Sequence, residues 1–142
     1  MLQVKHLLDD KGRDILAIAP DAPVLDAITM MAAKGIGALL VMQGEELLGI
    51  VSERDYARNV VLKGRSSSST LVREIMESGM TMVNPDDSID HCMRLCTNKR
   101  VRYLPVLDNG KTIGVLSLGD LVKAVISEQS EQIEQLHRYI AG

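Results

Sequence analysis

The sequence contains an internal repeat, which constrains the fold more than any other feature. Residues 20–60 align without a gap onto residues 85–125. Both copies begin with Pro-Asp, and both carry the pattern Gly-apolar-apolar-Ser-x-x-Asp, at 49–55 and 114–120. Repetition at a fixed spacing defines the structural unit. A unit of about 60 residues is marginal alone, so we expect the two copies to share a core.

Composition narrows the class of protein. The 142 residues are 46% hydrophobic and 25% charged, as in ordinary globular proteins. A net charge of −3 gives no basic field for nucleic acid or membranes, and the absence of Phe and Trp removes base-stacking platforms. Apolar runs are too short to span a membrane, and Asp9, Asp10 and Asp14 are unlike a targeting peptide. We expect a cytoplasmic protein.

Each repeat opens with a predicted amphipathic helix. Apolar residues recur at three- and four-residue spacing after each Pro-Asp. Asp21 and Asp86 are the predicted N-caps, and the helices are expected to end near Gly35 and Arg100.

Two apolar runs follow each helix and read as a hairpin. Asn109-Gly110 separates the second pair and is a strong hairpin signal. The runs are apolar on both faces, which indicates strands covered on two sides. A further short helix and a strand are expected before each Pro-Asp. The predicted order of elements in each unit is therefore helix, strand, helix, strand, strand, helix. The predicted strands are 14–19, 36–42, 47–52, 80–84, 102–108 and 112–117, and the predicted short helices are 4–8 and 72–76.

The predicted organisation has three parts. Residues 1–63 form the first repeat, 64–71 a Ser-rich linker, and 72–142 the second repeat with a C-terminal helix. That helix continues an apolar seam, for which we allow a break near Ser130. The seam either packs on its own repeat or forms a dimer contact, and we favour the dimer. It comprises Ile126, Gln129, Ile133, Leu136 and Ile140.

The two cysteines, Cys92 and Cys96, have two possible interpretations. They could be half of a metal site or a redox pair. The repeat places them on Ala27 and Met31, which are apolar positions of the same helix face. Cysteine behaves as a small hydrophobe in cores, and two thiols do not complete a tetrahedral site. We favour core packing and predict no metal site.

The repeated Ser and Asp also have two possible interpretations. Ser52 with Asp55, and Ser117 with Asp120, have the spacing of a helix capping box. That box normally uses the longer Glu or Gln at its third helical position, so capping alone explains Asp less well. Helix N-termini bind anions, and a carboxylate can accept both hydroxyl hydrogens of a ribose. The motif therefore indicates nucleoside phosphate binding as well as capping.

The assembled elements resemble a pair of cystathionine-beta-synthase (CBS) domains, the tandem called a Bateman module. The resemblance rests on the Pro-Asp start, on 102–106 before the hairpin, and on the Ser-x-x-Asp ending. No catalytic domain accompanies the repeats, so the chain is similar to stand-alone bacterial CBS-pair proteins. The resemblance implies an α/β (α+β) fold of two β-α-β-β-α repeats. They would face each other about a pseudo-two-fold axis with two clefts.

The resemblance also implies site residues. The family's ribose-binding carboxylate falls on Asp55 and Asp120, and its hydroxyl contact near phosphate on Ser52 and Ser117. The adenine slot would be lined by Leu16, Ile18, Gly37, Ala38, Thr81, Val83, Tyr103, Leu104 and Pro105.

Basic side chains are candidates for phosphate binding. Arg54, Arg100 and Arg102 lie in or near the repeated motifs. A guanidinium binds phosphate through two hydrogen bonds, although solvated surface charge is the alternative for each. Lys63 and Arg65 could reach a phosphate too, but ordinary linker residues are the simpler reading.

The expected function is an adenosine-nucleotide-binding regulatory module. The resemblance implies AMP, ADP, ATP, NAD or S-adenosylmethionine as ligand, and a homodimer as the assembly. We predict no enzyme and no catalytic residue, because no His or Cys repeats with the motif. The alternatives are a structural dimerisation module without ligand and a nucleic-acid-binding module using 99–102 and the Ser-rich linker.

Overall fold

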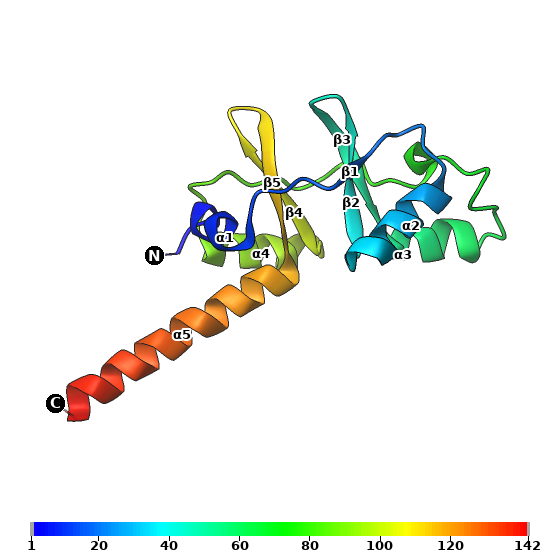
Figure 1. The fold of residues 1–142 in the computed structure, drawn as a ribbon. Helices are drawn as coiled ribbons and strands as arrows, with labels where there is room; N and C mark the ends of the chain where they lie inside the picture. Colours follow the sequence, from blue (N-terminus) through cyan, green and yellow to red (C-terminus); the bar gives the residue numbers. More distant parts are fainter. Residues whose placement is uncertain (1, 142) are drawn as a thin grey trace. The chain divides into compact units, whose positions relative to one another are not determined.

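The computed structural model describes residues 2–141, which form two compact units. The N-repeat unit comprises Asp14–Met80 together with Asn109–Ile113. The C-repeat unit comprises the residues up to Arg13, Thr81–Asp108 and the residues from Gly114 onward. The segment before the first strand of each repeat therefore belongs to the other unit: the residues up to Arg13 belong to the C-repeat unit, and residues 72–80 belong to the N-repeat unit. The fold is mixed α/β, as predicted (Figure 1).

A three-stranded sheet forms the centre of the N-repeat unit. Its strands are β1 (Ala17–Ile18), β2 (Ala38–Gln43) and β3 (Glu46–Ser52). β1 pairs in parallel with β2, and β2 pairs antiparallel with β3. Three consecutive residues of β2, Leu39 to Val41, are buried. This strand is therefore covered on both faces, as its continuous apolar run predicted.

Helices pack against this sheet. They are α2 (Val24–Lys34), α3 (Glu53–Tyr56), which continues as a π-helix over Ala57–Val61, and a 3₁₀ helix over Val72–Glu74. Their apolar side chains share one buried cluster with the strands. The cluster contains Ile18, Val24, Ala27, Met31, Leu39, Val41, Val51, Val60, Val72 and Ile75.

The second repeat contains a hairpin of β4 (Tyr103–Asp108) and β5 (Lys111–Ser117), of which the tip, Asn109–Ile113, belongs to the N-repeat unit and the rest to the C-repeat unit. Its turn residues Asn109 and Gly110 have φ of 51° and 79°, the left-handed pair that this hairpin signal predicts. Val83 pairs in parallel with Val106 of β4. Three helices complete the unit: α1 (Val4–Lys11), α4 (Ile89–Lys99) and α5 (Leu118–Ala141).

The N-terminal segment is fixed to this unit by backbone hydrogen bonds. The Val4 amide donates to the Asp87 carbonyl at 2.9 Å, and the Ile89 amide donates to the Leu2 carbonyl at 3.0 Å. α1 is thereby held beside the start of α4. Val4, Leu7 and Leu8 of α1 are buried. This placement brings α1 to the second repeat's motif.

The predicted N-caps Asp21 and Asp86 are wrong. α2 begins after Pro23, and α4 begins after Ser88, whose hydroxyl accepts the His91 amide at 3.0 Å. Each Pro-Asp lies in a turn, and the next two residues form a bend and a bridge, so the helices begin later than predicted. Asp21 and Asp86 instead form ion pairs with Arg73 and Lys5. The predicted helix ends are confirmed: Gly35 and Arg100 are left-handed, with φ of 65° and 55°.

Other local expectations are also corrected. α5 runs without interruption through Ser130, because an exposed serine inside a long helix costs little. The strand expected over 80–84 is reduced to the single bridge at Val83, and the strand expected over 14–19 to two residues. The helix expected over 72–76 is a 3₁₀ turn.

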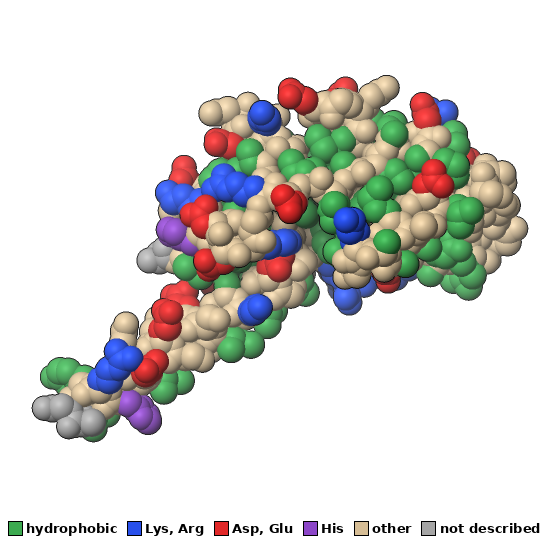
Figure 2. Space-filling view, viewed as in Figure 1, with side chains coloured by type: hydrophobic (Ala, Val, Ile, Leu, Met, Phe, Trp, Pro, Cys, Tyr) green, Lys and Arg blue, Asp and Glu red, His purple; other side chains and the backbone are tan. Residues whose placement is uncertain are grey.

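The C-terminal half of α5 leaves its apolar seam exposed. Ile133, Leu136 and Ile140 are 58%, 57% and 75% exposed. Figure 2 shows hydrophobic side chains along one edge of this helix, among charged ones. In the described residues, this part of the seam therefore does not pack on its own repeat. Within residues 2–141, none of the helices is both long and apolar enough to cross a membrane.

Candidate functional site

In the N-repeat unit, the Ser-x-x-Asp motif joins β3 to α3. Ser52 ends the strand with extended backbone and is the N-cap of α3. Its hydroxyl accepts the Asp55 amide at 3.2 Å. Asp55 Oδ2 accepts both the amide and the hydroxyl of Ser52, each at 2.9 Å. These bonds close a capping box, so the capping reading of the motif is confirmed.

The C-repeat motif has the same framework with a further partner. Ser117 Oγ accepts the Asp120 amide at 3.1 Å, and Asp120 Oδ2 accepts the Ser117 amide at 2.8 Å. The Lys11 ammonium of α1 lies 2.6 Å from the same oxygen and also donates to the Val115 carbonyl at 2.8 Å. Asp120 is therefore paired with a cation that the sequence motif does not contain.

The environment of Asp120 lowers the pKa of its carboxyl. Partial burial alone would raise that pKa, but the hydrogen bond and charge of Lys11 and the bonds from Ser117 outweigh it. Asp120 is therefore held ionised. In both units the aspartate binds its own turn through Oδ2, and Oδ1 accepts no hydrogen bond from residues 2–141. Each carboxylate thus keeps one oxygen that has no hydrogen-bond donor among the described residues.

The same backbone bond positions the strand start beside the motif in both units. The Glu53 amide donates to the Gly37 carbonyl at 3.0 Å, and the Leu118 amide donates to the Arg102 carbonyl at 2.8 Å. The first turn of each helix is thereby held against the residue before β2 or β4. This bond brings the predicted residues Gly37 and Arg102 next to Ser52 and Ser117.

The predicted adenine-slot residues lie beside these strand starts. The Leu40 amide donates to the Leu16 carbonyl at 3.2 Å, and the Val83 amide donates to the Pro105 carbonyl at 3.0 Å. Ile18, Val83, Leu104 and Pro105 are buried. Leu16, Gly37, Ala38, Thr81 and Tyr103 are half-buried and more open to contact.

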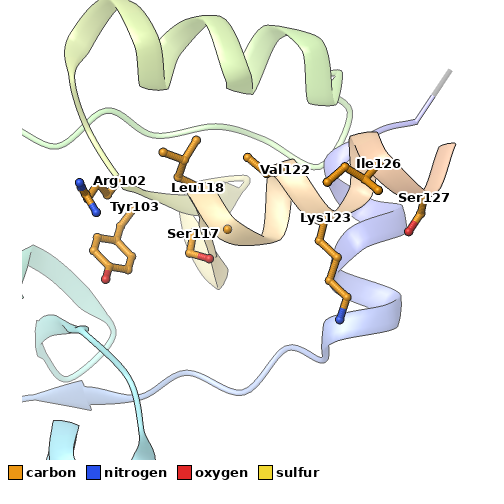
Figure 3. Close-up of a pocket in the computed structure, with 9 residues that line it drawn as sticks. Arg102, Tyr103, Ser117, Leu118, Val122, Lys123, Ile126 and Ser127 are labelled. Carbon is orange, nitrogen blue, oxygen red and sulfur yellow. The ribbon is translucent and has the colours of Figure 1, made fainter. Parts of the chain in front are cut away.

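A cavity of about 620 Å³ lies within the C-repeat unit at the start of α5. Arg102 and Tyr103 line one end, Ser117 and Leu118 the middle, and residues of the next helical turns the remainder (Figure 3). Ligand pockets commonly measure about 300–1,000 Å³. Three predicted site residues, Arg102, Tyr103 and Ser117, therefore share one cavity of ligand size.

Asp120 lines a second cavity, of about 370 Å³, between α1 and α5. Lys11 and Lys123 lie on its wall, and Lys123 also lines the larger cavity. Neither lysine was predicted as a site residue. Lys123 aligns with Arg58 of the first repeat, which was an available signal. Lys11 lies outside the aligned segments and reaches the motif only through the fold.

The three predicted phosphate-binding arginines have different positions. Arg102 lines the larger cavity, Arg54 is exposed on α3, and Arg100 is exposed at the end of α4. Arg100 has a φ of 55° where the first repeat has Gly35, and a left-handed backbone is unfavourable for a residue with a Cβ.

The motif glycines have a packing role. A Cβ on Gly49 would lie 2.7 Å from the Glu77 carbonyl oxygen, and a Cβ on Gly114 would lie 2.8 Å from Leu8 Cδ2. In each unit the close neighbour is the segment taken from the other half of the sequence. The glycines of the motif are therefore explained by this close approach.

The cysteines are core residues, as predicted. Cys92 and Cys96 are buried and unpaired thiols, and burial, followed by the charge of Asp87, raises the pKa of Cys92 to about 11. Within residues 2–141 there is no cluster of three His, Cys, Asp or Glu side chains placed to hold a metal ion.

Comparisons with known proteins agree with this architecture. The family model described as CBS domain matches residues 5–62 and 72–127. CBS domain-containing protein CBSX3, a mitochondrial protein of Arabidopsis thaliana, is 41% identical over 148 residues, covering 98% of this chain and 72% of the relative. A solved CBS-domain protein from Burkholderia ambifaria MC40-6 is 53% identical with a TM-score of 0.86, covering 89% and 96% of the two chains.

A more distant solved structure shares the fold. The CBS domain pair of MJ0100, in complex with 5′-methylthioadenosine and S-adenosyl-L-methionine, is 17% identical with a TM-score of 0.79. The alignment covers 90% of this chain and 98% of that one. With two matched segments in tandem and two units of matching geometry, the chain belongs to the CBS domain family.

Proposed function

We propose that this tandem CBS pair is a regulatory module that binds an adenosine-containing ligand in each repeat. The observation that supports it is the duplicated carboxylate, Asp55 and Asp120, fixed through Oδ2 beside a strand start. A carboxylate held in this way can accept the hydroxyl hydrogens of a ribose diol. The ligands of MJ0100 are adenosine derivatives, which favours the same chemical class here.

The surrounding groups suit the rest of such a ligand. In the C-repeat unit, Ser117 and Arg102 border the larger cavity, where a hydroxyl and a guanidinium can bind phosphate. Tyr103 lies beside them and offers an aromatic face to a base. In the N-repeat unit, the positions aligned with Arg102 and Tyr103 are the half-buried residues Gly37 and Ala38. AMP, ADP, ATP, NAD and S-adenosylmethionine share the adenosine that these groups would bind.

The exposed seam on α5 supports assembly into a homodimer through that helix. Apolar side chains of this size stabilise an interface by burial from water. Ile133→Glu with Leu136→Glu is expected to reduce the mass measured by light scattering from dimer to monomer. An unchanged dimer mass in that variant would assign the contact to another surface.

Thermal unfolding with AMP, ADP, ATP, NAD, NADH and S-adenosylmethionine tests the proposed function. A ligand at about 100 times its Kd adds about 2.7 kcal/mol of stability. For a chain of this size that corresponds to a rise of roughly 5–10 °C in Tm. No rise with any ligand would favour a structural module without ligand. Salt-dependent binding of RNA or DNA would favour nucleic acid, and product formation would indicate an enzyme.

A further inference from the structure

In the C-repeat unit, the Lys11 ammonium is hydrogen-bonded to Asp120 Oδ2, one of the two carboxylate oxygens to which a ribose diol would bind. Asp120 Oδ2 accepts the Ser117 amide at 2.8 Å and the Lys11 ammonium at 2.6 Å. A carboxylate oxygen has about two lone-pair positions for hydrogen bonds. Oδ2 of Asp120 is therefore filled, and Oδ1 alone is open to a ligand hydroxyl. The second bond of the ammonium, to the Val115 carbonyl, helps to hold it there.

The N-repeat carboxylate has a weaker second partner. Asp55 Oδ2 is also doubly bonded, but its second donor is the Ser52 hydroxyl. A hydroxyl rotates readily to another acceptor, whereas a charge-assisted bond from an ammonium is roughly twice as strong as a neutral one. Within residues 2–141, no ion pair involves Asp55.

The sequence explains this difference between the units. The segment 4–8 corresponds to 72–76, and continuing that spacing places Lys11 on Gly79. Glycine has no side chain, so the segment beside the N-repeat motif supplies no equivalent ammonium at that position. The two motifs are alike in sequence and differ in what the neighbouring segment contributes.

We infer that Lys11 competes with the ribose diol for the Asp120 carboxylate. The N-repeat site therefore binds ligand at a lower concentration than the C-repeat site. This inference rests on the proposed function. Asp55 can offer both oxygens to the diol after one hydroxyl rotates. Asp120 offers both only after Lys11 is displaced. An exposed or half-exposed ion pair is worth up to about 1 kcal/mol, which corresponds to about a fivefold difference in Kd.

Calorimetric titration with AMP of variants that retain one carboxylate tests this order. Asp55→Asn leaves the C-repeat site, and Asp120→Asn leaves the N-repeat site. We expect Asp55→Asn to bind AMP about fivefold more weakly than Asp120→Asn. Adding Lys11→Met to Asp55→Asn should recover about that factor. Adding it to Asp120→Asn should change nothing.

Two further variants control for fold and charge. Lys5 is also on α1 but pairs with the exposed Asp86 at 3.2 Å, so Lys5→Met in the Asp55→Asn background should leave the AMP affinity unchanged. Lys11→Arg keeps a cation and should keep the weaker affinity. A ligand-independent readout is the carboxyl resonance of Asp120, whose pKa should move up towards its ordinary value in Lys11→Met.

The outcomes separate the two proposals. Equal AMP affinities in the two single-carboxylate variants, or no gain from Lys11→Met, overturn the competitor role of Lys11 and leave the proposed function standing. An Asp120 pKa that is the same in Lys11→Met also overturns that role. Failure of the unsubstituted protein to bind AMP, ATP, NAD or S-adenosylmethionine overturns the proposed function and the competitor role together.

Discussion

The close approach at Gly49 predicts a large loss of stability for Gly49→Ala. The new Cβ would lie 2.7 Å from the Glu77 carbonyl oxygen, and ordinary contact begins at 3.4 Å. The Glu77 carbonyl must then move by about 0.7 Å, the difference between those distances. That carbonyl also accepts the Ile50 amide at 2.9 Å, so a shift of this size weakens or breaks the bond.

The magnitude follows from these two effects. Overpacking a fitted contact costs about 1–3 kcal/mol, and losing a backbone hydrogen bond about 1 kcal/mol. We expect the free energy of unfolding to fall by about 2–3 kcal/mol, lowering Tm by roughly 4–12 °C. Gly114→Ala meets only the end of the Leu8 side chain, which can rotate, so about 1 kcal/mol is expected.

Urea unfolding followed by circular dichroism measures these changes. Gly79→Ala is the matched control, because a Cβ there meets nothing within 4 Å and the backbone is not left-handed. That variant should be neutral or stabilised by up to about 1 kcal/mol, since alanine restricts the unfolded chain. Equal stability of Gly49→Ala and Gly79→Ala would refute the packing explanation for the motif glycine.

Three other predictions follow from single side chains. Ser88→Ala should lower the free energy of unfolding by about 1 kcal/mol through loss of the bond to His91, and a calorimetric Tm equal to the unsubstituted protein's would contradict the cap. Because the folded pKa of Asp120 lies below its ordinary 3.8, its stabilisation is present above that pH and is lost as the pH falls through the folded value. Asp120→Asn should therefore flatten the acid limb of a stability curve measured by urea unfolding, and an unchanged limb would disprove the linkage. With a pKa of about 11, the Cys92 thiol should resist iodoacetamide at pH 8 until the protein unfolds, and rapid labelling of the folded protein would contradict its burial.

Local signals in the sequence predicted much of the fold because their causes are local. Asn109-Gly110 predicted its hairpin since both residues tolerate positive φ, and Gly35 predicted the end of α2 for the same reason. Ser88 was missed as an N-cap because the repeated Pro-Asp favoured Asp86, two residues earlier. In the first repeat that position is Pro23, which has no hydroxyl, so the repeat itself hid the signal.

The parts that the sequence did not predict depend on contacts between distant segments. Lys11 and Asp120 are 109 positions apart and meet because the N-terminal segment packs in the C-repeat unit. Periodicity does not report such a pairing. The capping box was underestimated for a different, local reason: with the turn formed, the short aspartate side chain reaches the N-cap amide at 2.8–2.9 Å. The motif therefore caps its helix, and the ligand role of the second carboxylate oxygen is part of the proposed function.

The most direct test of the ribose assignment pairs a change in the protein with a change in the ligand. AMP and its 2′,3′-dideoxy analogue are titrated calorimetrically into the unsubstituted protein and into Asp55→Asn with Asp120→Asn. We predict that removing the diol or the carboxylates weakens binding at least tenfold, and that removing both weakens it no further, because both changes delete the same hydrogen bonds. Equal AMP affinity in the double variant, or losses that simply add, would contradict the assignment of these carboxylates to the ribose.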